Sequence, residues 1–221
     1  MNAPTRKKPG RPRDPDLETR RKAEILDAAA KDFAASGFAG TQVQTIADRL
    51  GVGNGTVYRY FPTKEALFLA AVDRGLEELT AEMDAVLDAP AADPVAQVRR
   101  AVRTYLGFFH RRPEMAELFI QERAAFPHHH RPLYFARQAS DEHDGRHSRF
   151  WEQLVASGVL RGVPRERFFA VMGDLLYGTI LTNLLSGRPT DPDTQTDDIL
   201  DVILTGLLTD RARSARPEAK R

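Results

Sequence analysis

The spacing of apolar residues along the chain predicts helices almost throughout. The first apolar stripe begins near residue 17 and ends at Gly37, where a glycine can adopt the left-handed conformation that closes a helix. Its apolar members are Ile25, Leu26, Ala29 and Phe33. This pattern is typical of an amphipathic helix with one buried face.

Two short helices are expected next. Thr41 to Gln44 fits a capping box, in which a Ser or Thr N-cap is followed three residues later by Glu or Gln. Val43, Ile46, Ala47 and Leu50 then share one helical face, and Gly51 ends the helix. A second short helix from Asn54 to Phe61 ends at Pro62, and the small turn between the two predicts a helix-turn-helix.

Proline, glycine and cap signals divide the remaining chain into longer helices. We expect them over residues 63–89, 94–112, 113–125, 133–157, 164–186 and 197–210, with residues 187–197 as a polar connector. The clearest start is Asp93-Pro94, an N-cap residue followed by proline at the first helical position. The predicted fold is all-α, with about nine helices and no convincing strand.

Composition narrows the classes of function. The 221 residues are 42% hydrophobic and 29% charged, as in ordinary folded proteins. The absence of cysteine excludes disulfides, thiolate metal sites and cysteine nucleophiles. The most apolar stretch, residues 168–185, contains Asp174 and Asn183, and no secretion signal is recognisable. We therefore expect a cytoplasmic protein with no membrane span.

The net charge of +1 conceals an uneven distribution. Residues 1–64 contain 12 Lys and Arg against 7 Asp and Glu, whereas residues 65–221 contain 20 against 24. A basic N-terminal part joined to a mildly acidic one indicates a polyanion-binding module attached to a domain with another task.

The second short helix would present the residues for that binding. Val57 and Phe61 fall on one side and are expected to point inward. The opposite side carries Gly55, Thr56 and Arg59, with Tyr58 and Tyr60 at its margins. Such side chains can enter a major groove of DNA. Lys64 adds a cation at the start of the next helix, although Thr63-Lys64-Glu65 also fits a plain cap with solvated charges.

These residues resemble the tetracycline-repressor (TetR) family of bacterial transcriptional regulators. The resemblance covers residues 20–70 and is carried by Ile25 to Ala29, Phe33, Gly37 and the run TQVQTIADRLGVGNGTVYRYFPTKEALF from Thr41 to Phe68. It implies an all-helical DNA-binding domain. The turn usually reads Ser-Lys-Gly in that family and is Gly53-Asn54-Gly55 here, so Asn54 stands where a lysine contacts DNA.

The resemblance implies a role for each matching residue. Thr41 and Thr45 would approach phosphates or bases from the supporting helix, and Lys64 would contact the DNA backbone. The recognition contacts would come from Asn54, Gly55, Thr56, Tyr58, Arg59 and Tyr60. From the residue types, Thr41 equally fits a helix cap, and Tyr60 equally fits packing against the first helix.

The N-terminal segment suggests a further DNA contact. Pro9-Gly10-Arg11-Pro12-Arg13 resembles the core of an AT-hook, whose extended strand places arginines in a narrow minor groove. Arg11 and Arg13 are the candidate contacts, and a solvated basic tail acting only by its charge is the alternative.

The predicted domain order is a disordered basic arm over residues 1–16, a helix-turn-helix domain over 17–66 with its motif at about 42–61, a larger helical domain over 67–212 and a disordered tail over 213–221. Seven of the ten residues from Ile199 to Leu208 are apolar. Helices 165–186 and 197–210 are therefore predicted to form a homodimer interface, with a thicker monomer core as the alternative. The resemblance likewise implies dimers and a small ligand held in this domain.

Aromatic and polar residues mix along the larger domain, as ligand pockets require. The candidate ligand-binding residues are Phe109, Phe119, Glu122, Arg123, Phe126, His143, His147, Trp151 and Tyr177. They would suit a hydrophobic or aromatic small-molecule effector, although an aromatic stripe at this spacing is also typical of a plain core.

Histidines offer an alternative function. His143 and His147 have the i, i+4 spacing of helical zinc proteases, but Asp144 replaces the required glutamate and no third ligand follows at a recognisable spacing. We therefore predict no metal, no cofactor and no catalysis. The sequence favours a dimeric repressor released from a palindromic operator by an effector, with a helical metal-dependent enzyme using His143 and His147 as the alternative.

Overall fold

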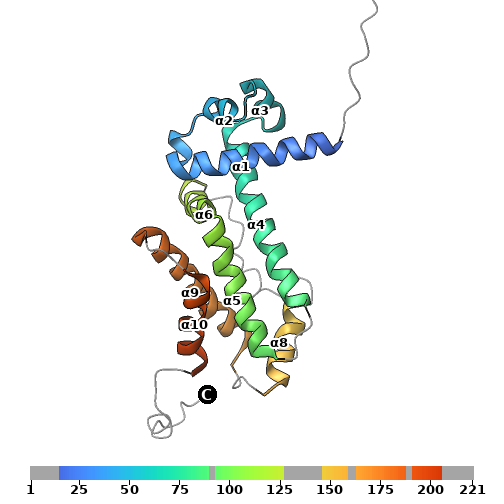
Figure 1. The fold of residues 1–221 in the computed structure, drawn as a ribbon, viewed down its shortest axis with the longest axis vertical. Coiled ribbons are helices and arrows are strands. Elements are labelled where there is room, and N and C mark those ends of the chain that lie inside the picture. The colour runs from blue at the N-terminus through green and yellow to red at the C-terminus, as the bar shows by residue number, and fades with distance from the viewer. Residues whose placement is uncertain (1–14, 90–92, 127–145, 159–162, 188–190, 206–221) are drawn as a thin grey trace, which may run out of the picture. The chain divides into compact units, whose positions relative to one another are not determined.

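A computed structural model describes residues 15–89, 93–126, 146–158, 163–187 and 191–205 (Figure 1). These ranges hold nine α-helices, a short π-helical turn and no strand. The helices are α1 Pro15–Gly40, α2 Val43–Arg49, α3 Asn54–Tyr60, α4 Lys64–Asp88, α5 Pro94–Arg111, α6 Pro113–Ala125, α8 Arg146–Ala156, α9 Arg165–Ser186 and α10 Pro192–Leu200, followed by η1 Asp201–Thr205. The all-α prediction is confirmed.

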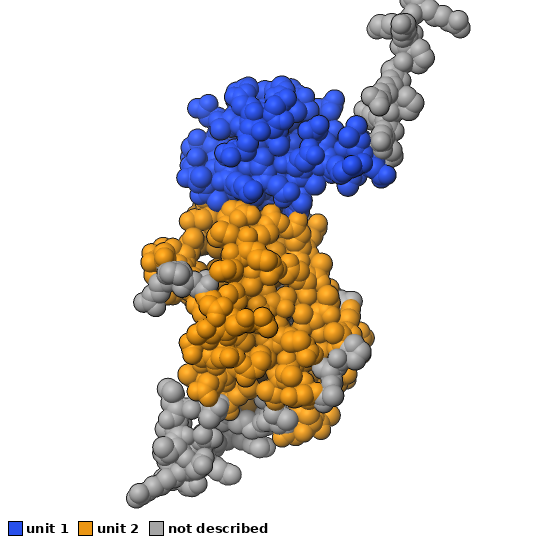
Figure 2. All heavy atoms as spheres, in the orientation of Figure 1, with its two compact units in different colours: residues 1–74 blue, residues 75–221 orange. Residues whose placement is uncertain are grey.

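The chain divides into two compact units, residues 1–74 and 75–221, with the boundary inside α4 (Figure 2). The predicted domain boundary at residue 66 falls inside the first unit, near the start of the same helix. Helix α1 begins at Pro15, two residues before the predicted start of folded structure.

The core of the first unit joins α1, α2, α3 and the beginning of α4. Ile25, Phe33, Ile46, Val57 and Phe68 are fully buried. The rings of Phe33 and Phe68 meet edge to face with their centroids 5.0 Å apart. Predicted inward residues on three helices are therefore buried together, which fixes α3 against its support.

The connection from α1 to α2 differs from the predicted capping box. The hydroxyl of Thr41 lies 2.8 Å from the carbonyl oxygen of Gly37 and 3.1 Å from that of Asp32, both in α1. The N-cap of α2 is Gln42, without a side-chain cap bond, and Gln44 donates to Asp48 instead. The capping-box prediction is wrong because the Thr41 hydroxyl bonds to carbonyl oxygens of α1 and Gln44 bonds to Asp48.

In the second unit, α5 supplies much of the core. Val98, Val102, Tyr105, Leu106 and Phe108 are buried along it. The predicted N-cap is confirmed, since the Asp93 carboxylate accepts a hydrogen bond from the backbone N–H of Val95 at 2.8 Å. The buried side chain of Gln97 donates to the carbonyl oxygens of Val86, Leu87 and Ala89, which close the C-terminal end of α4.

The last described helix begins earlier than predicted. Helix α10 starts at Pro192 rather than at residue 197, because Asp191 caps it and accepts from the backbone N–H of Thr194 at 3.0 Å. Asp191-Pro192 repeats the signal of Asp93-Pro94, so the sequence did contain this start. The predicted end near residue 210 lies outside the described residues, as does the first part of the predicted helix 133–157.

Helix α9 agrees with the predicted helix 164–186 and is strongly apolar. At 22 residues and a mean hydropathy of 1.5 over its apolar window, it is long and apolar enough to cross a membrane by length and composition alone, and only 22% of that window is buried. The exposed apolar side chains are Val171, Leu175, Leu181 and Leu185. Within the described part of the chain, each of these side chains stays more than a third exposed.

Candidate nucleic-acid interface and ligand cavity

Helices α2 and α3 are joined by a tight turn. Gly51 has a φ of 64°, in the left-handed region that favours glycine. The backbone N–H of Val52 donates to the Ala47 carbonyl oxygen at 3.0 Å, and that of Thr56 donates to Gly53 at 2.8 Å. Val57 is buried against the core, so the opposite face of α3 is directed to solvent.

That exposed face pairs a cation with an aromatic ring. Arg59 Nη2 donates to the Tyr60 hydroxyl at 3.2 Å, and its guanidinium carbon lies 4.9 Å from the Tyr60 ring centroid. Tyr58 is 41% exposed beside them. Gly55 is exposed, whereas Thr56 and Tyr60 are half-buried. The predicted inward and outward sides of α3 are thus the ones observed.

Asn54 occupies the first position of α3 and is half-buried. Its Oδ1 atom is buried and has no hydrogen-bond partner among the residues the structure describes. A Cβ at the flanking Gly53 or Gly55 would meet nothing within 4 Å, so both glycines border open space.

Lys64 and Thr41 are engaged inside the first unit. Lys64 Nζ donates to the carbonyl oxygens of Ala39 and Thr41, each at 3.2 Å, and lies 4.8 Å from the Phe38 ring centroid. Thr41 is only 4% exposed, which assigns its side chain to the fold rather than to a DNA-facing surface. Thr45 on α2 is exposed. No pattern in the sequence indicated the lysine's internal contacts.

Several predicted site residues lie outside the part of the chain that the structure describes. Arg11, Arg13 and His143 are beyond the described ranges, and His147 is described only as part of α8, without its side chain. Within the described part of the chain, no group of three or more His, Cys, Asp or Glu could hold a metal ion.

A cavity of about 290 Å³ lies between α5, α6 and α9, and four predicted ligand residues line it: Phe109, Phe119, Arg123 and Tyr177. Glu122 is buried beside it, with Oε2 3.4 Å from Arg123 Nε. Half-buried Phe126 follows at the C-cap of α6. Trp151 packs elsewhere, with its ring centroid 5.2 Å from that of Phe168. Tyr105 also lines the cavity and was missed, although it lies one turn before Phe109.

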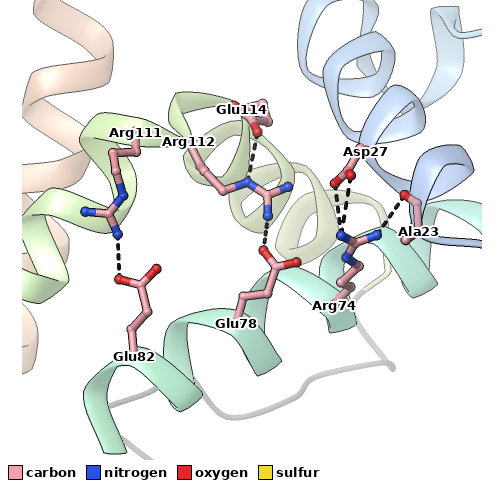
Figure 3. A network of polar contacts seen from close by, with 8 residues as sticks. All are labelled: Ala23, Asp27, Arg74, Glu78, Glu82, Arg111, Arg112 and Glu114. Atoms are coloured by element: carbon pink, nitrogen blue, oxygen red, sulfur yellow. Dashed lines mark hydrogen bonds and ion pairs between the residues drawn. The ribbon is translucent and has the colours of Figure 1, made fainter. Parts of the chain in front are cut away.

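Helix α4 is held by arginines along its length (Figure 3). In the first unit, Arg74 of α4 donates to the Ala23 carbonyl oxygen at 2.7 Å and pairs with Asp27 at 3.3 Å. In the second unit, two glutamates of α4 pair with the junction of α5 and α6. These contacts are Glu78 with Arg112, Arg112 with Glu114 at 3.1 Å, and Glu82 with Arg111 at 2.5 Å.

The fold and the exposed face of α3 define a helix-turn-helix protein with a second, cavity-bearing helical unit. Residues 25–71 match the family described as bacterial regulatory proteins, tetR family. The transcriptional regulator RutR of Escherichia coli (strain K12) is 33% identical over 105 residues, 48% of this chain and 49% of RutR. The chain thus spans about half the length of RutR and of other curated relatives that it matches.

Two further comparisons cover more of the chain. The transcriptional repressor NicS of Pseudomonas putida is 28% identical over 171 residues, 77% of this chain and 78% of NicS. The structure of FadR from Bacillus subtilis in complex with stearoyl-CoA shares the fold, with a TM-score of 0.61 and 17% identity over 84% of this chain and 99% of FadR. The similarity to the tetR family thus rests on residues 25–71 and on relatives that are named as transcriptional regulators.

Proposed function

We propose that this protein is a sequence-specific DNA-binding transcriptional regulator, a dimeric repressor that leaves a palindromic operator when a small-molecule effector binds. The observation that carries the proposal is the exposed Arg59–Tyr60 pair on α3, on a helix whose other face is fixed by buried Val57. A rigid helix with a basic and aromatic outer face suits major-groove recognition. Bacterial regulators of this kind act in the cytoplasm, and we infer the same here.

The proposed base and phosphate contacts are those of the exposed helix face and its flanks: Asn54, Gly55, Thr56, Tyr58, Arg59 and Tyr60, with Thr45 from α2. Lys64 contributes positive charge, while its bonds to Ala39 and Thr41 hold the loop that supports α2. Arg11 and Arg13 are the proposed minor-groove contacts. The Thr41 side chain is not among the proposed DNA contacts, because its hydroxyl is bonded inside the fold.

The exposed apolar face of α9 supports a homodimer. Val171, Leu175 and Leu185 are 55%, 38% and 77% exposed and recur at helical spacing. Covering them with the same face of a second copy, together with α10, buries apolar surface that a monomer leaves in water. Two copies would place recognition helices about 34 Å apart, one turn of DNA.

The cavity between α5, α6 and α9 is the proposed effector site, and its aromatic lining supports a hydrophobic or aromatic ligand. The repressor NicS and the stearoyl-CoA complex of FadR are relatives in which repression or ligand binding is named. No observation on the described residues favours the enzyme alternative.

The test is a selection of bound fragments from genomic DNA, followed by affinity measurements across a salt series. We expect a short palindrome, with affinity that falls as salt rises because bound arginines and lysines release counterions. Arg59→Ala should weaken binding to the selected palindrome roughly 10- to 100-fold. Arg100→Ala removes the same charge from an exposed position on α5 and should change little.

Two outcomes contradict the proposal. One is the absence of any enriched sequence, and the other is an equal effect of the Arg59 and Arg100 variants. In either case α3 does not read DNA sequence.

A further inference from the structure

The cavity between α5, α6 and α9 has an aromatic wall. The ring centroids of Tyr105 and Phe109 are 5.2 Å apart, those of Phe109 and Phe119 are 5.9 Å apart, and those of Tyr105 and Tyr177 are 6.2 Å apart. Tyr105 is fully buried. The volume of the cavity, about 290 Å³, is at the lower end of the range for small-molecule sites. An apolar ligand body fits this lining.

Arg123 supplies the one permanent charge in that lining, as far as the structure describes it. It lies in the last turn of α6, and its side chain is 33% exposed, so the guanidinium is at the edge of the cavity. Glu122, whose side chain is 5% exposed, approaches its Nε at 3.4 Å. The buried carboxylate therefore lies within ion-pair distance of the guanidinium.

The chemistry of a guanidinium selects the polar group of the ligand. Its planar fork has five N–H donors, so a guanidinium can bond to more than one acceptor at the same time. A carboxylate matches this fork with two parallel charge-assisted hydrogen bonds, which a neutral ester or alcohol cannot form. Low polarity around the cavity strengthens that preference.

Neighbouring cavities lack this combination. One lined by Met83, Phe150 and Phe168 has a volume of about 40 Å³, enough for a water molecule or two. Another, also about 290 Å³, shares Phe109 and Ile180 with the aromatic cavity but has no Arg, Lys, Asp or Glu in its described lining. Of these three cavities, the one between α5, α6 and α9 has an arginine beside its apolar lining, as far as the described residues show.

We propose that this cavity binds an amphiphilic monocarboxylic acid, with its aromatic or aliphatic body against the rings of Phe109, Phe119 and Tyr177 and its carboxylate on Arg123. The inference rests on the proposed function only in treating that acid as the effector. It names the chemical class of the ligand, which the aromatic lining alone does not define.

The experiment is titration calorimetry on the full-length protein without DNA. The probes are 4-phenylbutyrate and octanoate, each compared with its methyl ester and with the alcohol of the same chain. We expect both acids to bind about 10-fold or more tightly than their esters. Arg123→Met should reduce acid binding to the level of the ester and leave ester binding unchanged. Arg100→Met on α5 is the charge-matched control and should have no effect.

Arg123→Met also removes the partner of buried Glu122, so a second variant separates recognition from folding. Glu122→Gln/Arg123→Met has no buried unpaired charge and should show the same loss of preference for the acid. Arg123→Lys keeps the charge without the fork and should be intermediate. Thermal melting checks that each variant is folded.

Three results overturn the inference: equal affinity for acid and ester, no binding of any probe, or equal effects of the Arg123 and Arg100 variants. Release of the selected operator is measured separately. Acid binding without operator release would retain the ligand class and remove the effector role. Failure to select an operator would contradict the proposed function and leave the calorimetric result standing.

Discussion

Gly75 lies in the interior of α4, where glycine is an unfavourable residue for a helix. A Cβ at this position would overlap the end of the Met115 side chain, which projects from α6 and is fully buried. The glycine therefore lets α6 approach α4 within the second unit. Helical spacing alone gave no reason to single out either residue, because the contact joins positions forty residues apart in the chain.

We expect Gly75→Ala to lower the free energy of unfolding by about 1–3 kcal/mol through overpacking, in spite of the higher helix propensity of alanine. In a Met115→Ala background the same change should cost nothing or stabilise, since the space is then open. Chemical denaturation of the four proteins in this cycle measures the coupling. An equal cost of Gly75→Ala in both backgrounds would show that Met115 is not the cause.

At the scale of elements, the helices whose ends carry local signals were predicted well. Asp93-Pro94 and Pro113 define α5 and α6, and buried Val57 confirms the inward face of α3. The exception is α10, whose Asp191-Pro192 signal lies five residues before the predicted start. The capping-box error falls where a side chain serves another element, as Thr41 serves α1. The candidate cavity was predicted in part, because spacing along α6 places Phe119 and Arg123 together, whereas only tertiary packing separates Trp151 from them.

Helix α10 depends on one exposed carboxylate. Asp191 accepts hydrogen bonds from the Thr194 hydroxyl at 2.5 Å and from the Thr194 backbone N–H at 3.0 Å. These bonds, the hydroxyl first, hold the pKa of Asp191 below its ordinary value of 3.8. A lowered folded-state pKa means that the carboxylate stabilises the fold above pH 3.8 and loses this contribution as the pH falls through the folded-state pKa.

Asp191→Asn keeps an N-cap acceptor and removes the titration. We expect the free energy of unfolding of this variant to equal that of the wild type near the midpoint of acid unfolding. It should also fall less steeply as the pH drops below 3.8. Asp191→Ala should be less stable at every pH above that. Denaturation midpoints across a pH series measure both effects, with Asp198→Asn, an exposed change in the body of α10, as the control. If stability falls with pH as steeply in Asp191→Asn as in the wild type, then titration of Asp191 does not contribute to the loss of stability in acid.

At the scale of the whole molecule, the main feature is the exposed apolar face of α9. The apolar window of this helix has a mean hydropathy of 1.5, but only 22% of the window is buried. Contiguous exposed apolar surface of this kind is typical of an interaction site. Its exposed residues recur along one stripe, and Gly178 on the same stripe is open, since a Cβ there would meet nothing within 4 Å. The missing side chain at Gly178 leaves room for a second helix to approach this stripe.

We expect Val171→Glu/Leu185→Glu to convert the protein from dimer to monomer, because pairing would bury carboxylates without partners. Light scattering after size exclusion measures the mass. The affinity for the full palindrome should fall at least about 100-fold, towards that for a half-site, because two linked recognition helices no longer bind as one unit. Val155→Glu on α8 introduces the same charge at a residue that is 46% exposed, and it should remain a dimer with full affinity. A monomeric wild type, or a double variant that stays dimeric, would assign the interface elsewhere.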